Sequence, residues 1–70
     1  MKDYLRFNDY IATVHYNPED EVFHGRVHGI NDLVTFEGQS VKELKVAFAE
    51  AIEDYLNFCK EVGKSPEKTL

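Results

Sequence analysis

The stretch SVKELKVAFAEAIEDYLNFCKEVG, residues 40–63, carries the clearest structural signal in the chain. Ser40 followed three residues later by Glu43 is a capping box, in which each side chain accepts a hydrogen bond from the first turn's free backbone amides. Gly63 is typical of the residue that ends a helix, because glycine adopts a left-handed conformation at little cost. The two signals predict one helix of about 22 residues between them.

One face of this predicted helix is apolar. Its apolar residues recur every three or four positions, which is the spacing of a single helical face: Val41, Leu44, Ala47, Phe48, Ala51, Ile52, Tyr55, Cys59 and Val62. A helix of this length spans about 33 Å, whereas an eight-residue strand spans about 26 Å. The C-terminal part is therefore expected either to expose some of its apolar residues to a second protein or to be covered by the N-terminal hairpin or by an oblique helix crossing: Tyr55, Leu56, Phe58, Cys59 and Val62.

The residues before the helix predict an antiparallel sheet. Turn sequences separate four β-prone runs: residues 4–7, 10–16, 22–29 and 33–38. Within these runs apolar side chains occupy alternate positions, so that Tyr10, Ala12, Val14 and Tyr16 share one face of their strand. Phe23 and Val27 are expected on the same apolar side of the sheet. We predict an α+β fold, in which an antiparallel three-stranded meander and a short N-terminal strand pack on one long C-terminal helix. Gly25 is interpreted as the point where the helix approaches the sheet closely.

Composition limits the class of protein. Seventy residues with 43% apolar side chains form one small domain of modest stability, so a partner or self-association is expected. The single cysteine excludes an internal disulfide, and neither a leader nor an apolar run long enough for a membrane is visible, so we expect a cytoplasmic protein. A net charge of −5 disfavours direct nucleic-acid binding and favours a basic protein partner.

The histidines are the first candidates for a metal site. His24 and His28 lie four residues apart, which is about 13 Å along a strand, so they cannot share one zinc ion. His15 on the neighbouring strand is expected to approach His24, but no third ligand has an evident place beside them. We therefore predict no metal site and no cofactor. The three histidines are expected to face solvent or a partner.

Catalytic residues are equally hard to find. Glu19, Asp20 and Glu21 cluster at a turn, where acids are common as solvated charge, although they would also suit docking of a basic protein. Cys59 falls within the apolar stripe of the helix and is expected to behave as a small hydrophobic residue without a neighbouring base. We predict that the domain is not an enzyme and has no catalytic residues.

Three stretches stand in a distinctive order. They are F-x-G-x-V-x-G-I at residues 23–30, V-T-F-x-G-x-S at residues 34–40 and E-L-x-x-A-F-x-x-A-I-x-D-Y-L at residues 43–56. Together they resemble the HicB family of toxin–antitoxin antitoxins, over about residues 3–68. The resemblance implies a β-β-β-α unit similar to a truncated ribonuclease H fold. It assigns residues 1–63 to a toxin-binding domain and leaves residues 64–70 as a polar tail or the start of a linker.

The resemblance also implies a function. HicB-like antitoxins mask the active site of HicA-type toxins, which are small basic messenger-RNA interferases. Ribonuclease H chemistry is not carried over, because it needs several carboxylates converging on two metal ions and the central strand supplies none. Family members often continue into a DNA-binding domain, and repression is not carried over to these 70 residues.

The residues expected to bind the toxin follow from predicted exposure alone. Acids at the rim would steer encounter and apolar anchors would provide affinity: Glu19, Asp20, Glu21 and Asp32 as acids, and Leu56 and Phe58 as anchors. An exposed edge strand would also allow a homodimer. The alternatives are a non-catalytic homo-oligomeric adaptor, and a metal-binding or residual nuclease protein that uses the histidine face.

Overall fold

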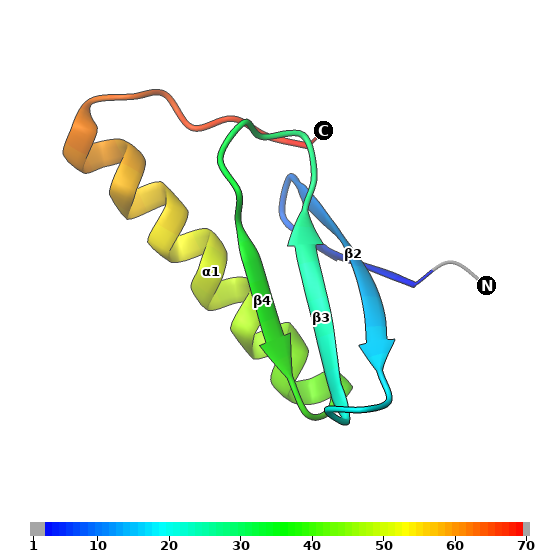
Figure 1. Cartoon of the computed structure of the whole chain (residues 1–70). Coiled ribbons are helices and arrows are strands. Elements are labelled where there is room, and N and C mark those ends of the chain that lie inside the picture. The colour runs from blue at the N-terminus through cyan, green and yellow to red at the C-terminus, as the bar shows by residue number, and fades with distance from the viewer. Residues whose placement is uncertain (1–2, 70) are drawn as a thin grey trace.

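The computed structural model, which describes residues 3–69, consists of four antiparallel strands followed by one long helix (Figure 1). The strands are β1 (Tyr4–Phe7), β2 (Tyr10–Asn17), β3 (Val22–Val27) and β4 (Thr35–Gly38), and the helix is α1 (Val41–Val62). The sheet order is β1-β2-β3-β4, so every connection within the sheet joins neighbouring strands. The predicted α+β arrangement is confirmed. Met1, Lys2 and Leu70, which the predicted domain and tail include, lie outside the described residues.

The turn sequences act as expected. Asn8 takes a φ of 52° in the two-residue β1–β2 turn, where Phe7 pairs with Tyr10. At the next turn the side-chain oxygen of Asn17 accepts hydrogen bonds from the amides of Glu19 (3.0 Å) and Asp20 (3.4 Å). Such a side-chain turn satisfies backbone donors locally, which explains why the strand ends there.

Both ends of α1 carry the predicted caps. The Ser40 hydroxyl accepts a hydrogen bond from the Glu43 amide at 3.1 Å, and the Glu43 carboxylate accepts one from the Gln39 amide at 3.1 Å. Gly63 adopts the left-handed conformation, with φ 71°, and the Lys64 amide donates to the Cys59 carbonyl at 2.8 Å. These bonds satisfy backbone groups that the ends of a helix otherwise leave free.

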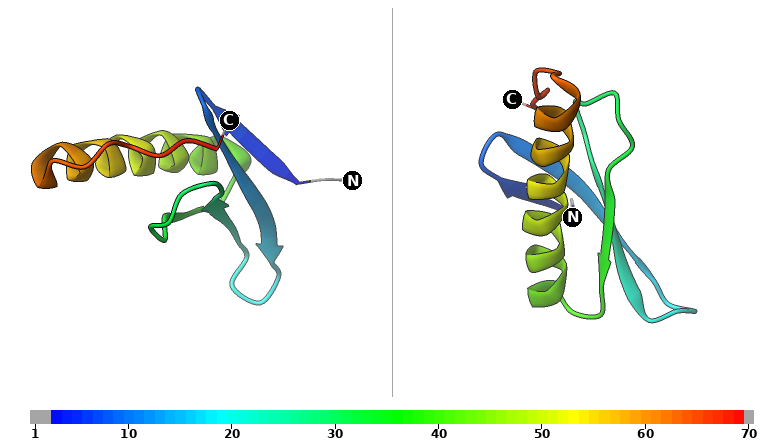
Figure 2. Two further views of the ribbon diagram at one scale, coloured as in Figure 1. Left: turned by 90° about the horizontal axis from the view of Figure 1, so that it is seen from above. Right: turned by 90° about the vertical axis from the view of Figure 1, so that its left-hand side faces the viewer.

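The helix lies along one face of the twisted sheet, whereas no described element covers the opposite face (Figure 2). Phe48 is the centre of the core, since its ring stacks on Phe36 of β4 at 4.8 Å and meets Phe7 of β1 at 6.0 Å. The buried apolar residues come from β2, β3, β4 and α1: Tyr10, Ala12, Val27, Phe36, Leu44, Phe48, Ile52, Tyr55 and Cys59.

The interpretation of Gly25 was wrong in one respect. A Cβ atom at Gly25 would lie 2.2 Å from the ring of Phe36, its partner on β4, so the space is filled by that ring and not by the helix. The close approach of the helix occurs at Gly38, where a Cβ atom would lie 2.7 Å from the Leu44 backbone nitrogen. The neighbour of Gly25 is set by the pairing of β3 with β4, and the alternation of side chains along β3 gives no information about that pairing.

Residues 64–69, which we call the strap, cross back over the end of the domain (Figure 1). The strap is joined to the β1–β2 hairpin, to the loop before β4 and to α1: Lys64 with Asp32, Glu67 with Asn31 and Tyr55, Lys68 with Asp9, and Thr69 with Asp9, Ile11 and His28. This polar, aperiodic segment therefore lies against the domain up to Thr69. It closes the end of the core where the helix extends beyond the strands.

Candidate functional site

The residues predicted to bind a partner lie on three separate parts of the surface. The acids of residues 19–21 occupy the β2–β3 turn and are exposed. Asp32 and Phe58 lie near the opposite end, where the β3–β4 loop faces the last turns of α1. Leu56 is exposed, but it is two residues from Phe58 and therefore about 200° away around the helix. The structure brings Asp32 and Phe58 together and leaves the other four apart from them.

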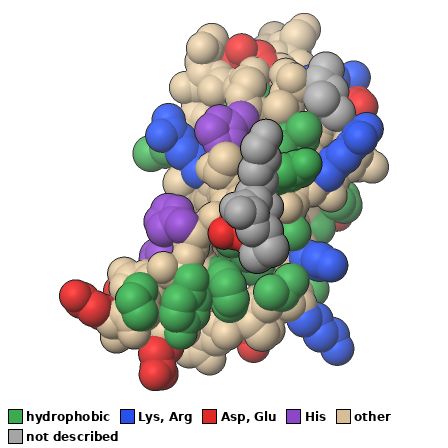
Figure 3. Space-filling model, turned by 90° about the vertical axis from the view of Figure 1, so that its right-hand side faces the viewer, with side chains coloured by type: hydrophobic (Ala, Val, Ile, Leu, Met, Phe, Trp, Pro, Cys, Tyr) green, Lys and Arg blue, Asp and Glu red, His purple; other side chains and the backbone are tan. Residues whose placement is uncertain are grey.

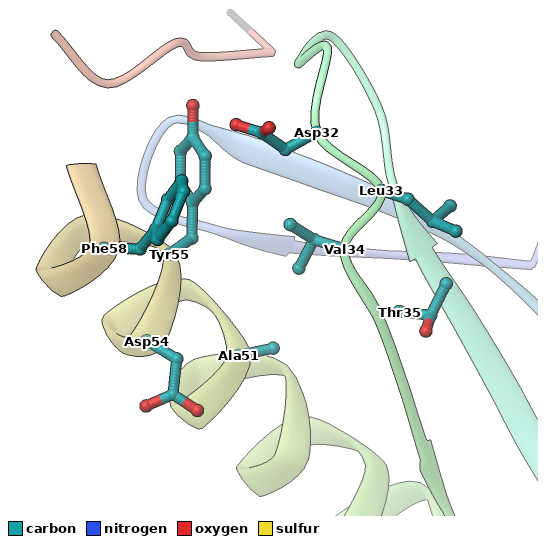
Figure 4. Close-up of a pocket in the computed structure, with 8 residues that line it drawn as sticks. All are labelled: Asp32, Leu33, Val34, Thr35, Ala51, Asp54, Tyr55 and Phe58. Carbon is teal, nitrogen blue, oxygen red and sulfur yellow. The ribbon is translucent and has the colours of Figure 1, made fainter. Parts of the chain in front are cut away.

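Asp32 and Phe58 belong to a groove of about 450 Å³, which we call the loop–helix groove (Figure 4). It is lined by residues of the β3–β4 loop, the start of β4 and α1: Asp32, Leu33, Val34, Thr35, Ala51, Asp54, Tyr55 and Phe58. Figure 4 shows Asp32 pointing toward Tyr55, while Leu33 points the other way. Phe58 is 48% exposed, so this groove offers an aromatic side chain beside carboxylates.

One basic side chain of the strap lies at this groove. The Lys64 ammonium donates to the Asp32 carboxylate and lies 5.9 Å from the centre of the Tyr55 ring. The hydrogen bond to Asp32 raises the pKa of Lys64 above its usual value. Burial raises the pKa of the Tyr55 hydroxyl, which accepts a hydrogen bond from the Glu67 amide at 3.0 Å. Asp32, predicted as an acid of the rim, is thus already paired within the domain.

In the C-terminal half of the helix, some apolar residues are covered and others are exposed, so each of the two expectations holds for different residues. Tyr55 and Cys59 are buried, and Tyr55 meets the ring of Tyr10 edge-on at 6.4 Å, so the N-terminal hairpin covers this part together with the strap. Leu56, Phe58 and Val62 stay exposed. The free thiol of Cys59 is among the most buried groups, as its place in the apolar stripe predicts.

A second hollow, of about 230 Å³, lies at the other end of the domain, and we call it the aromatic hollow. Its apolar lining comes from three strands and the start of α1: Tyr4, Leu5, Val14, Tyr16, Phe23, Val41 and Leu44. The Tyr16 and Phe23 rings are 4.9 Å apart, and Tyr16 is about half exposed. Figure 3 draws the side of the domain that lies on the right in Figure 1, and it shows hydrophobic side chains in a row along the lower part, with acidic side chains beside them.

Sequence reasoning missed the aromatic hollow. Alternation correctly placed Tyr16 and Phe23 on the helix side of the sheet, but the end of the β2–β3 hairpin turns away from the helix start (Figure 2). The predicted helix is longer than the predicted strands, so their lengths give no sign that the end of the β2–β3 hairpin would lie away from the helix start.

The histidines form a row on the outer face of the sheet. His15 lies directly opposite His24, with ring centres 5.7 Å apart, which confirms their predicted proximity. The Glu37 carboxylate lies 3.7 Å from His24 Nδ1, so a carboxylate that sequence reasoning did not foresee is present. His28 instead pairs with the Thr13 hydroxyl at 2.8 Å. Among residues 3–69, no three histidine, cysteine or acidic side chains are grouped so that they could hold a metal ion.

Comparisons of the chain with protein-family models, with curated proteins and with solved structures find no match.

In the part of the chain that the structure describes, α1 is not apolar enough to cross a bilayer.

Proposed function

We propose that this domain is the antitoxin of a type II toxin–antitoxin pair and acts in the cytoplasm. In this role it binds a small basic HicA-type messenger-RNA interferase and masks its active site, without catalysis of its own. The loop–helix groove carries the proposal, because its lining combines the half-exposed Phe58 with two acidic residues, Asp32 and Asp54. The net charge of −5 and the HicB-like sequence stretches support the same reading.

Each part of the groove has a physical role in such a complex. Removing a half-exposed aromatic ring from water lowers the free energy of the complex, and buried aromatic anchors dominate the affinity of many interfaces. Carboxylates at the edge attract a basic chain and mainly raise the rate of association. Masking needs only that the bound domain fills the space above the toxin's catalytic residues, so no chemistry is required of the antitoxin.

The proposal is tested by co-expressing this chain with the basic protein encoded by the neighbouring reading frame. We expect the second protein alone to arrest growth, the pair to restore growth, and the two chains to purify together. A neighbouring product that is not toxic, or that is toxic but neither rescued nor retained, would contradict the function.

Phe58→Ser is expected to weaken toxin binding about 10- to 30-fold, because truncating an interface anchor costs about 1.4–2 kcal/mol. Isothermal titration calorimetry with the purified toxin measures the change. Val46→Ser is the matched control, since Val46 is also an exposed apolar residue of α1 but lies outside the loop–helix groove. Equal affinities for the two variants would place the toxin elsewhere on the domain.

The aromatic hollow favours a second candidate function, that of a homo-oligomeric adaptor. Its lining contains mainly aromatic and aliphatic side chains with Asp3 as the acid, so it suits an apolar surface such as a second copy. In that case the chain alone is a dimer by light scattering, and Tyr16→Ser converts it to a monomer. A monomeric wild-type chain excludes self-association through this hollow.

A further inference from the structure

The loop–helix groove contains a seat for a positively charged side chain. The Asp32 carboxylate and the Tyr55 ring hold the Lys64 ammonium between them, the first by a hydrogen bond and the second at 5.9 Å from the ring centre. A carboxylate and an aromatic face are two features that attract ammonium and guanidinium groups. Both residues also line the groove, and Asp32 is the member of the seat that a partner reaches, because its side chain is 37% exposed whereas Tyr55 is buried.

The lysine in this seat can be replaced. The side chains of Lys64 and Asp32 are 34% and 37% exposed, so water reaches the pair. Ion pairs at this degree of exposure contribute little to stability. Lys64 also lies one residue beyond the helix cap Gly63, in a strap that other contacts hold at Glu67, Lys68 and Thr69. Its side chain can therefore leave Asp32 while the rest of the strap stays in place.

Building on the proposed function, we propose that the Asp32–Tyr55 seat binds a lysine or arginine side chain of the basic partner, and that Lys64 occupies it until the partner displaces it. The two positive groups compete for one carboxylate, because a second ammonium beside Lys64 would be repelled. Arginine suits the seat well, since its planar guanidinium can bond the Asp32 carboxylate through two donors.

With such competition, the apparent affinity for the toxin equals the affinity of molecules with a free seat multiplied by the fraction of molecules in which the seat is free. For a solvent-exposed ion pair, that fraction corresponds to about a two- to six-fold weakening. Lys64→Met keeps most of the aliphatic stem and removes the charge, so it should tighten toxin binding about two- to six-fold. Lys64→Arg, a stronger competitor for the same carboxylate, should weaken toxin binding.

The test measures toxin affinity by calorimetry for wild type, Lys64→Met, Lys64→Arg and Asp32→Asn. The control is Lys60→Met, which removes an exposed lysine of the last turn of α1. The expected order of affinity is Lys64→Met, then wild type, then Lys64→Arg, with Asp32→Asn several-fold weaker than wild type. Lys60→Met should not tighten binding as Lys64→Met does. Urea denaturation of every variant shows that it is folded.

The outcomes separate this inference from the proposed function. If Lys64 only holds the strap, Lys64→Met binds no better than wild type and Lys64→Arg binds like wild type, which overturns the inference while toxin binding stands. Wild-type affinity in Asp32→Asn also overturns it. If the wild-type domain does not bind the toxin, the proposed function fails first, and the seat for a basic partner fails with it.

Discussion

Phe48→Ala is expected to remove about 3–5 kcal/mol from the free energy of unfolding, which is the usual cost of truncating a buried phenylalanine. Phe48 is 2% exposed, and its ring contacts Phe36 on one edge strand and Phe7 on the other. A domain of 70 residues has about 4–10 kcal/mol of stability in total. We therefore expect the variant to be largely or partly unfolded at 37 °C.

Urea denaturation followed by circular dichroism measures this loss. Val46→Ala is the control, because Val46 is an exposed residue of the same helix and its truncation should change stability by about 0.5 kcal/mol or less. A loss below about 1 kcal/mol for Phe48→Ala would mean that the sheet and the helix are not held together by this ring.

Gly25→Ala is expected to destabilise the domain by about 1–3 kcal/mol or more, although it adds a single methyl group. The added Cβ atom would lie 2.2 Å from the Phe36 ring, which cannot retreat because it is stacked on Phe48 at 4.8 Å. The ring or the β3–β4 pairing must shift, and either change loosens the contact between sheet and helix.

A double-mutant cycle tests the cause. Phe36→Leu shortens the side chain that meets the new methyl group, so Gly25→Ala should cost clearly less in the Phe36→Leu background than in wild type. Gly63→Ala is a useful contrast, since no atom lies within 4 Å of the added methyl group. Its only cost is the strain of placing an alanine at a φ of 71°. Additive losses for Gly25→Ala and Phe36→Leu would show that the ring is not the obstacle.

The elements of the fold could be predicted because their signals are local. The cap at Ser40, the stop at Gly63 and the three-to-four spacing between them specify α1 within one stretch of sequence. Turn residues such as Asn8 and Asn17 likewise mark the ends of strands. These local signals do not show which side chains meet across paired strands. The prediction that the helix is the neighbour of Gly25 is therefore wrong, since that neighbour is Phe36 on β4.

The candidate site could be predicted only in part, because its contacts join residues far apart in sequence. Asp32 and Lys64 are 32 positions apart, and no local pattern relates them. Leu56 and Phe58, both predicted as anchors, lie on opposite flanks of the apolar stripe, and the helical repeat alone contains this separation. The aromatic hollow depends on how far the β2–β3 hairpin turns from the helix, which alternation along a strand does not encode.

The strap has a consequence for the order in which the chain folds. Its bond between Thr69 and the Ile11 amide spans 58 positions, and its other contacts reach two loops and the helix. Such a segment gains its contacts only after the hairpin, the loop and the helix end have come together. We expect it to close last during folding and to open first in the native state, uncovering Tyr10 and Tyr55 while the sheet remains intact.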